Sequence, residues 1–155
     1  MLAAAVVIVG VTVTAGGTGE AKKPDPERRD GKCGKISGTM MTNIGAIDET
    51  HTLGTVTGDL AGAVSATIVE LTPSYAVVVH NFVTEAGDSL RARPARVDFG
   101  PPNAAGQVLA SGEIIFAGGT GKYTGATGQA KAFGSGDLAA GQTVFRYSGE
   151  LCAGK

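Results

Sequence analysis

The chain has 155 residues, a net charge of −1 at pH 7 and 25 glycines, about twice the glycine share of an average domain. This length suits a single domain. The near-neutral charge argues against nucleic-acid binding, because beyond residue 32 the only basic cluster is Arg91, Arg93 and Arg96. No helix-length amphipathic period occurs after Lys35, which excludes helical bundles and βαβ folds.

Residues 1–21 have the pattern of a secretory leader. Leu2–Thr14 is an apolar run that is too short for a membrane-spanning helix, which needs about 20 residues. Small residues follow, and both Val13-Thr14-Ala15 and Gly19-Glu20-Ala21 fit a signal-cleavage pattern. No Lys or Arg precedes the run, and a buried first strand is the alternative interpretation. The leader predicts a secreted or periplasmic location.

Residues 22–32 are expected to form a flexible, charged tether. The segment contains Pro24 and Pro26 among many charged residues, so it cannot bury enough apolar surface to offset the entropy of ordering it. The folded domain is therefore predicted to span residues 33–155.

Turn signals recur about every ten residues in this domain, a spacing typical of all-β barrels and sandwiches. Eight strands joined in this way suit a closed antiparallel β-barrel, which has no exposed sheet edge. The predicted strands are Lys35–Thr42, Thr50–Val56, Asp59–Leu71, Tyr75–Thr84, Ser89–Phe99, Gln107–Phe116, Gln129–Ser135 and Thr143–Cys152.

The strands in the middle of the chain are apolar on both faces. In Tyr75–Thr84, the row that contains Tyr75 and Asn81 opposes the row that contains His80 and Phe82, and both rows are rich in valine or alanine. Such a strand needs an apolar lumen on one side and a cover on the other, which a subunit contact would supply. Because His80 and Asn81 lie on opposite faces, at most one of them faces the lumen.

Cys33 and Cys152 lie near the two ends of the predicted domain. Two cysteines in an exported chain usually form a disulfide, and the first and last strands of a closed barrel are neighbours. Two separate reduced thiols would instead fit an intracellular protein. Two distant cysteines and two histidines, His51 and His80, give no spacing typical of zinc, so no metal is expected.

A glycine-rich block, Gly118–Gly128, follows the alternating segment Val108–Phe116. A phosphate-binding loop would need glycine at position 116 and Ser or Thr at 123, where Phe116 and Tyr123 stand. A dinucleotide-binding fingerprint would need glycine or alanine at Thr124 and a following helix, which the sequence does not predict. Both nucleotide interpretations fail.

The block resembles a motif of the dirigent and allene-oxide-cyclase-like barrel superfamily, GGTG-(K/R)-(F/Y)-x-G-A-x-G. Softer matches are Gly58–Gly62 and Tyr147–Gly149. The resemblance implies an eight-stranded barrel that holds a hydrophobic small molecule in its mouth and steers its cyclisation or isomerisation, without a cofactor. It also implies a homo-oligomer, in this superfamily commonly a trimer. The matching glycines are expected to be structural: Gly118, Gly119, Gly121, Gly125 and Gly128.

Polar residues among apolar ones are the candidate site residues. Glu70 shares a predicted face with Val64, Ala66 and Ile68, and Glu113 shares one with Leu109 and Ile115. A carboxyl group in an apolar lumen can exchange a proton near neutral pH, and an arginine can stabilise developing negative charge. The alternative for each is a solvated position on the outer face. The predicted catalytic residues are Glu70, Glu113 and Arg93, and the predicted ligand-binding residues are Tyr75, Asn81, Arg91, Phe116 and Tyr147.

Three functions remain open from the sequence: a cyclase or isomerase, a non-catalytic carrier, and a structural surface barrel. An enzyme predicts an acid, a base or an arginine that faces an open lumen. A carrier predicts an apolar lumen, and a structural barrel predicts a lumen filled by side chains.

Overall fold

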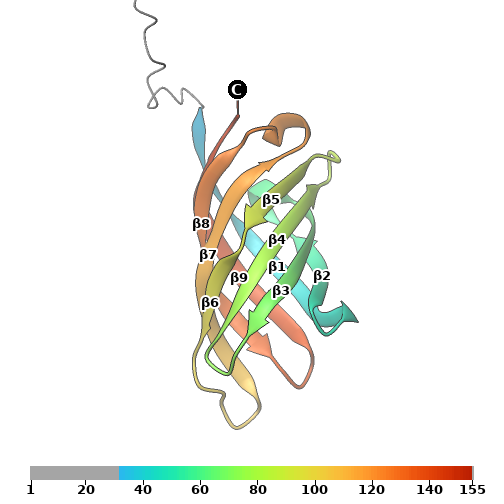
Figure 1. The fold of residues 1–155 in the computed structure, drawn as a ribbon, viewed down its shortest axis with the longest axis vertical. Coiled ribbons are helices and arrows are strands. Elements are labelled where there is room, and N and C mark those ends of the chain that lie inside the picture. The colour runs from blue at the N-terminus through green and yellow to red at the C-terminus, as the bar shows by residue number, and fades with distance from the viewer. Residues whose placement is uncertain (1–31, 155) are drawn as a thin grey trace, which may run out of the picture.

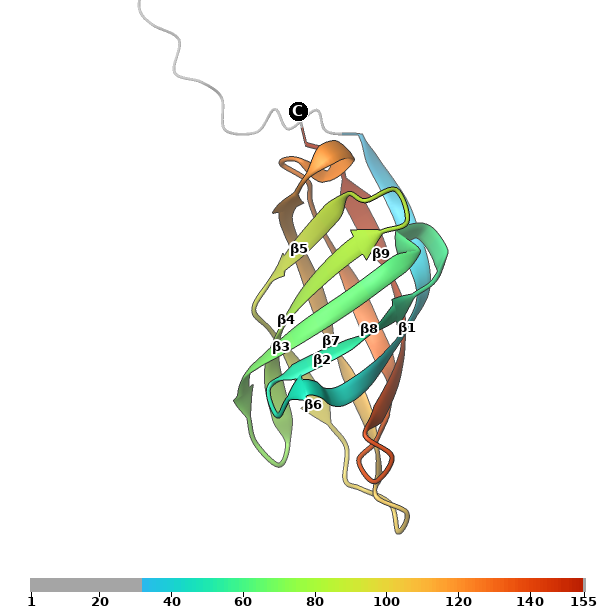
Figure 2. The ribbon, with the colours of Figure 1, turned by 90° about the vertical axis from the view of Figure 1, so that its right-hand side faces the viewer.

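The computed structural model describes residues 32–154, which form one closed β-barrel (Figures 1 and 2). The signal-like leader 1–21 and most of the predicted tether lie outside the described residues. The nine strands are β1 Cys33–Asp48, β2 His51–Val56, β3 Gly62–Leu71, β4 Tyr75–Thr84, β5 Ser89–Arg93, β6 Ala95–Phe99, β7 Gln107–Gly119, β8 Thr127–Asp137 and β9 Gln142–Cys152. Two short 3₁₀ helices, η1 Gly58–Leu60 and η2 Gly121–Tyr123, precede β3 and β8.

The barrel has eight strand positions, all antiparallel to their neighbours. β5 and β6 both pair with β4 on one side and with β7 on the other, so together they occupy one position. Pro94 separates them, because a proline has no N–H to donate to the ladder. The pairing of β3 with β4 closes the sheet. The predicted eight-stranded antiparallel barrel is confirmed.

Most strand boundaries lie within a few residues of those predicted, and β4 matches its prediction at both ends. Two differences have local causes. The predicted strand Ser89–Phe99 is divided at Pro94, and the start of Asp59–Leu71 belongs to η1. Gly58 has a φ of 83°, which tightens the chain into a turn before β3 begins.

A disulfide joins the first and last strands of the barrel. Cys33 and Cys152 are directly opposite in the β1–β9 ladder, with their Cα atoms 3.9 Å apart, and they bond across 119 positions of sequence. The predicted disulfide is confirmed. Its position follows from barrel closure, because the first and last strands are neighbours.

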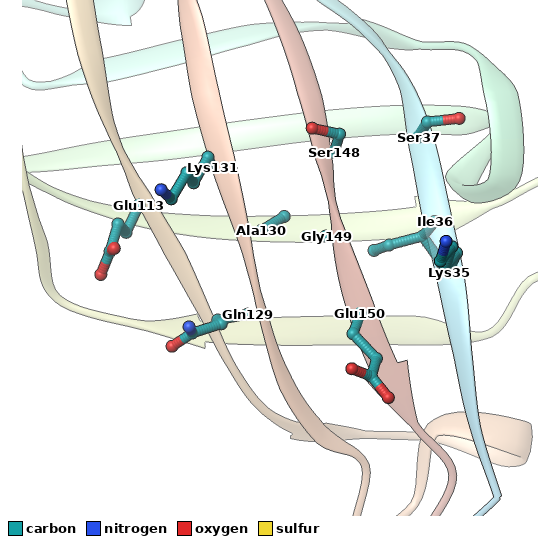
Figure 3. Close-up of a pocket in the computed structure, with 10 residues that line it drawn as sticks. All are labelled: Lys35, Ile36, Ser37, Glu113, Gln129, Ala130, Lys131, Ser148, Gly149 and Glu150. Carbon is teal, nitrogen blue, oxygen red and sulfur yellow. The ribbon is translucent and has the colours of Figure 1, made fainter.

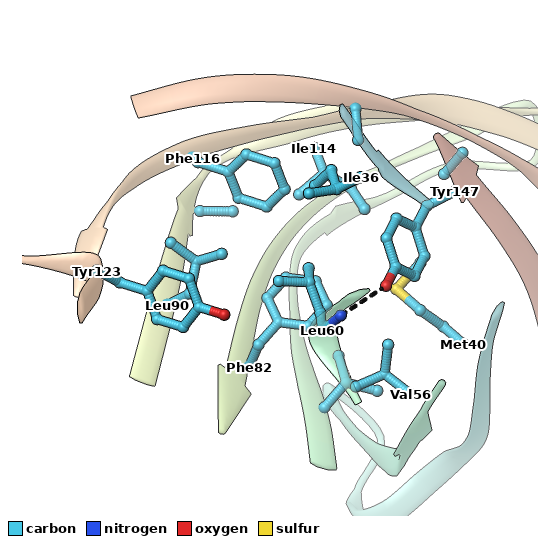
Figure 4. Close-up of a cluster of buried hydrophobic side chains, with 14 of the residues drawn as sticks. Ile36, Met40, Val56, Leu60, Phe82, Leu90, Ile114, Phe116, Tyr123 and Tyr147 are labelled. Atoms are coloured by element: carbon cyan, nitrogen blue, oxygen red, sulfur yellow. Dashed lines mark hydrogen bonds between the residues drawn. The ribbon is translucent and has the colours of Figure 1, made fainter. Parts of the chain in front are cut away.

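The half of the lumen nearest the disulfide is filled by side chains (Figure 4). Its largest buried members are Tyr147, Phe82, Phe116, Leu60 and Leu90. The Tyr147 hydroxyl accepts a hydrogen bond from the Leu60 backbone N–H at 3.1 Å and donates one to the Thr57 carbonyl at 3.0 Å. This end of the barrel is therefore a packed core.

The two 3₁₀ turns close this end in the same way. Thr57-Gly58-Asp59-Leu60 and Thr120-Gly121-Lys122-Tyr123 each place their last residue, Leu60 or Tyr123, in the core. The glycine-rich block thus serves as a turn that inserts an aromatic side chain into the barrel end.

No helix in the described part of the chain is long and apolar enough to cross a membrane.

Candidate functional site

The half of the lumen farthest from the disulfide contains a cavity of about 580 Å³. The loops between β3 and β4, β6 and β7, and β8 and β9 surround its mouth, at the lower end in Figure 1. Apolar side chains from the surrounding strands form its wall, among them Met40, Ile68, Ala76, Val78, Val97, Phe99, Val108, Ala110, Ala132 and Phe145.

Small residues at inward positions explain why this half is open. Ala66 on β3, Ala76 on β4, Ala110 on β7 and Ala132 on β8 are all buried and line the cavity. Gly136 also lines it. In the filled half, the corresponding inward positions carry residues such as Phe82 and Phe116. A small eight-stranded barrel either fills its lumen or holds one small ligand, and this barrel divides its length between the two.

Two polar side chains in the cavity wall, Thr52 and His80, each have a buried atom without a hydrogen-bond partner in the described structure. The Thr52 Oγ1 and His80 Nδ1 atoms are both buried, and both residues line the cavity. Burial lowers the pKa of His80 to about 4, because the apolar surroundings disfavour the charged ring. His80 is therefore neutral at pH 7.

A second pair of polar side chains, from β1 and β9, forms a hydrogen bond within the pair. The Thr42 and Thr143 hydroxyls hydrogen-bond to each other at 2.7 Å and also line the cavity. The one charged residue that contributes to the wall is Glu113, and its side chain is exposed on the outer face. Among residues 32–154, no charged side chain is directed into the cavity.

The placement of Glu70 in the lumen is wrong. A β-bulge shifts the β3–β4 register between Ile68 and Glu70, so the alternation predicted from the sequence reverses at that point. Glu70 is exposed, and its Oε1 accepts a hydrogen bond from the Tyr75 hydroxyl at 2.6 Å. The Arg96 guanidinium lies 3.9 Å from the centre of the Tyr75 ring. Glu70 and Tyr75 thus form an outer-face contact.

The remaining polar candidates also lie outside the lumen. Arg91 and Arg93 are exposed, because the alternate positions of β5, Leu90 and Ala92, face inward. Asn81 pairs directly with Arg91 in the β4–β5 ladder, on the face opposite to His80. The prediction of Asn81 as a ligand-binding residue is wrong, because His80 takes the inward position and Asn81 lies on the opposite face.

Glu113 lies in a groove on the outer surface of β1, β7, β8 and β9 (Figure 3). Two lysines and two glutamates line this groove, and Glu113 faces Lys131 across the β7–β8 ladder. The groove thus carries balanced charge on an open sheet surface. The expectation that Glu113 faces an apolar lumen is wrong, because the adjacent residues Gly112 and Ile114 take the inward positions.

Phe116 and Tyr147 face inward but belong to the filled half, where both are almost fully buried. None of the five predicted ligand-binding residues therefore lines the cavity. Thr52 and His80 were not chosen from the sequence. The available signal was a histidine in the otherwise apolar row Ala76, Val78, His80, Phe82.

One group in the described residues has the composition of a metal site: Cys33, Glu150 and Cys152. Both of its sulfur atoms are in the disulfide and so are not thiolates. This group gives no support for a metal centre.

Burial of neutral His80 predicts that the protein loses stability between about pH 6.5 and pH 4. The unfolded chain protonates this ring near the ordinary pKa of 6.5, whereas the folded chain does so only near 4. Between these values the unfolded state binds more protons, so the free energy of unfolding falls as the pH is lowered, by about 3 kcal/mol in total. Urea unfolding at a series of pH values measures this.

His80→Phe is expected to remove that part of the pH dependence. Hydrogen bonds from His51 and Thr50 lower the pKa of Asp48, and the Ala140 N–H and Gln107 lower that of Asp137, both from 3.8. Their stabilising contribution is lost as the pH falls below about 5, so the slope between pH 6.5 and pH 5 is the part that reports His80 alone. An unchanged slope in the variant would contradict a buried neutral His80.

No family model and no curated protein sequence matches the chain. Among solved structures, the chain is similar to a pterocarpan synthase dirigent protein at 14% sequence identity and a TM-score of 0.39. The match covers 88% of this chain and 98% of that one. It says nothing of what the present chain binds.

Proposed function

We propose that this barrel binds a small hydrophobic molecule in the open half of its lumen. The observation that carries the proposal is the apolar cavity of about 580 Å³ with a mouth at one end of the barrel. Ligand sites are typically concave, largely apolar and about 300–1,000 Å³ in volume, with a few polar groups. Both the size and the lining of this cavity fit that description.

A carrier is favoured over a catalyst. The residues predicted to be catalytic, Glu70, Glu113 and Arg93, are exposed. Burial lowers the pKa of His80, the titratable side chain directed into the cavity, so its imidazole is a weak base at pH 7. Cyclisation or isomerisation by confinement alone is the catalytic alternative. A purely structural barrel is disfavoured because only half of the lumen is filled.

Export is part of the proposal. The disulfide is of the kind that persists in oxidising compartments, and the apolar run Leu2–Thr14 has the pattern of a signal peptide. A mature protein that still carries residues 1–21 when isolated from its native source would contradict export by signal cleavage.

A homo-oligomer, a trimer by resemblance, also remains a proposal. Exposed apolar residues on the outer face would supply its contact, with Leu109, Val144 and Met41 in one lateral row across β7, β8, β9 and β1. A solution mass equal to one chain at micromolar concentration would exclude it.

Gly136 provides the test of ligand binding. It lies in the cavity wall on β8, and a Cβ added there would make only ordinary van der Waals contacts, with Val108 Cγ2 at 3.5 Å, Thr143 Cγ2 at 3.8 Å and the Gln142 carbonyl oxygen at 4.0 Å. Gly136→Leu is therefore expected to fill cavity volume without displacing the backbone. It should weaken binding of the neutral fluorescent probe N-phenyl-1-naphthylamine at least tenfold, as measured by titration.

The matched control is Gln129→Leu, which places the same side chain at an exposed position of β8 outside the row of Leu109, Val144 and Met41. It should leave probe affinity unchanged, and both variants should keep the wild-type circular dichroism spectrum. The proposal fails if wild-type protein shows no saturable probe binding, or if the two variants bind the probe equally well.

A further inference from the structure

Thr52, Ala66 and His80 form one lateral row across the cavity wall. Thr52 pairs with Ala66 in the β2–β3 ladder, and Ala66 pairs with His80 in the β3–β4 ladder. Neighbouring strands are about 4.8 Å apart, so the backbones of Thr52 and His80 are separated by about 10 Å. Ala66, a small residue, lies between them in this row, and all three residues line the cavity.

Both polar side chains lack a partner within the described protein. The Thr52 Oγ1 and His80 Nδ1 atoms have no hydrogen bond, although each is buried. Leaving one such atom unpaired costs about 1–3 kcal/mol, and buried polar atoms of native proteins are nearly always paired. Because neither atom is exposed to the cavity in this structure, contact with a ligand requires Thr52 to rotate about χ1 and the imidazole ring to turn about χ2.

The hydrogen-bonding capacity of this row is uncharged. A neutral imidazole offers one donor and one acceptor, and a threonine hydroxyl offers both. No Lys or Arg of the described residues lines the cavity. A ligand carboxylate would therefore be buried without a counterion, at a cost of several kcal/mol.

We propose that the cavity selects hydrophobic molecules that carry an uncharged hydrogen-bonding group, such as a hydroxyl, and that His80 and Thr52 bind this group. The cavity correspondingly discriminates against hydrophobic carboxylates. This inference rests on the proposed function and specifies its ligand class.

Three ligands that share one ring system test it: naphthalene, 2-naphthol and 2-naphthoate. Their affinities are measured on the full chain at pH 7 by displacement of N-phenyl-1-naphthylamine. We expect 2-naphthol to bind about tenfold more tightly than naphthalene, and 2-naphthoate to bind at least tenfold more weakly than 2-naphthol. This ranking needs only the wild-type protein.

Two variants test whether His80 and Thr52 cause the preference for 2-naphthol over naphthalene. Thr52→Val keeps side-chain size and His80→Phe keeps a planar ring, and both remove the polar atoms, so each should reduce the advantage of 2-naphthol over naphthalene to less than about threefold without weakening naphthalene. Thr55→Val, on the exposed face of β2, is the matched control and should keep the wild-type ranking.

The outcomes separate the two proposals. If all three ligands bind with similar affinity, or 2-naphthoate binds most tightly, the head-group preference is wrong while lumen binding stands. If 2-naphthol is preferred but neither cavity variant changes the preference, the assignment to His80 and Thr52 is wrong. If no ligand displaces the probe and the probe itself does not bind, the proposed function fails, and this inference fails with it.

Discussion

Replacing both cysteines, as Cys33→Ser with Cys152→Ser, is expected to lower the free energy of unfolding by about 4–5 kcal/mol. The disulfide closes a loop of 119 residues, and cross-linking a loop of that length removes much of the conformational entropy of the unfolded chain. The measurement is urea unfolding of the wild type and the double variant under identical non-reducing conditions.

The double variant should still fold as a barrel. β1 and β9 pair without interruption from Cys33–Cys152 to Asn43–Gln142, so the ladder closes the wall without the covalent bond. Reduced wild-type protein is the control and should match the double variant. A loss of less than about 1 kcal/mol would mean that the unfolded state is already compact enough to make the cross-link ineffective.

The fold could be predicted because alternation and turn signals are local properties. β4 is flanked by Thr72-Pro73-Ser74 and Glu85–Asp88, and its boundaries match the prediction at both ends. Barrel closure then placed Cys33 beside Cys152. The division at Pro94 was also visible in the sequence, since a proline interrupts a ladder, but the prediction ran one strand through it.

The site could not be predicted because it depends on which face of each strand is inward. A bulge adds one residue to one strand, and everything beyond it changes face. Glu70 lies immediately after such a bulge, so its apolar neighbours Ala66 and Ile68 gave the wrong face. Nothing in the local pattern of β3 marks the extra residue.

The position of the cavity along the barrel could not be predicted from the sequence for a second reason. The residues that line it come from strands far apart in sequence, such as Ala76 and Ala110. Their small size has a consequence only after the cross-strand register aligns them. The same register separates Phe116 and Tyr147 from the cavity, although both face inward as a ligand-binding residue should.

The cross-strand register also decides where the barrel wall requires a glycine, and Gly149 is the position with the largest expected effect. It lies on β9, opposite Ile36 of β1 and Ala130 of β8. A Cβ added there would overlap the Gln129 carbonyl oxygen and the Ala130 Cα, both backbone atoms of β8. Because backbone in the middle of a ladder cannot move aside as a flexible side chain can, Gly149→Ala is expected to cost about 3 kcal/mol or more.

Gly34→Ala is the matched control on the adjacent strand β1. A Cβ at Gly34 would have nothing within 4 Å, and the residue is exposed. Because alanine restricts the unfolded chain, this variant should be neutral or more stable by up to about 1 kcal/mol. Urea unfolding of the two variants beside the wild type gives the comparison. Equal effects at the two positions would show that the close approach of β8 to β9 is not what requires glycine at 149.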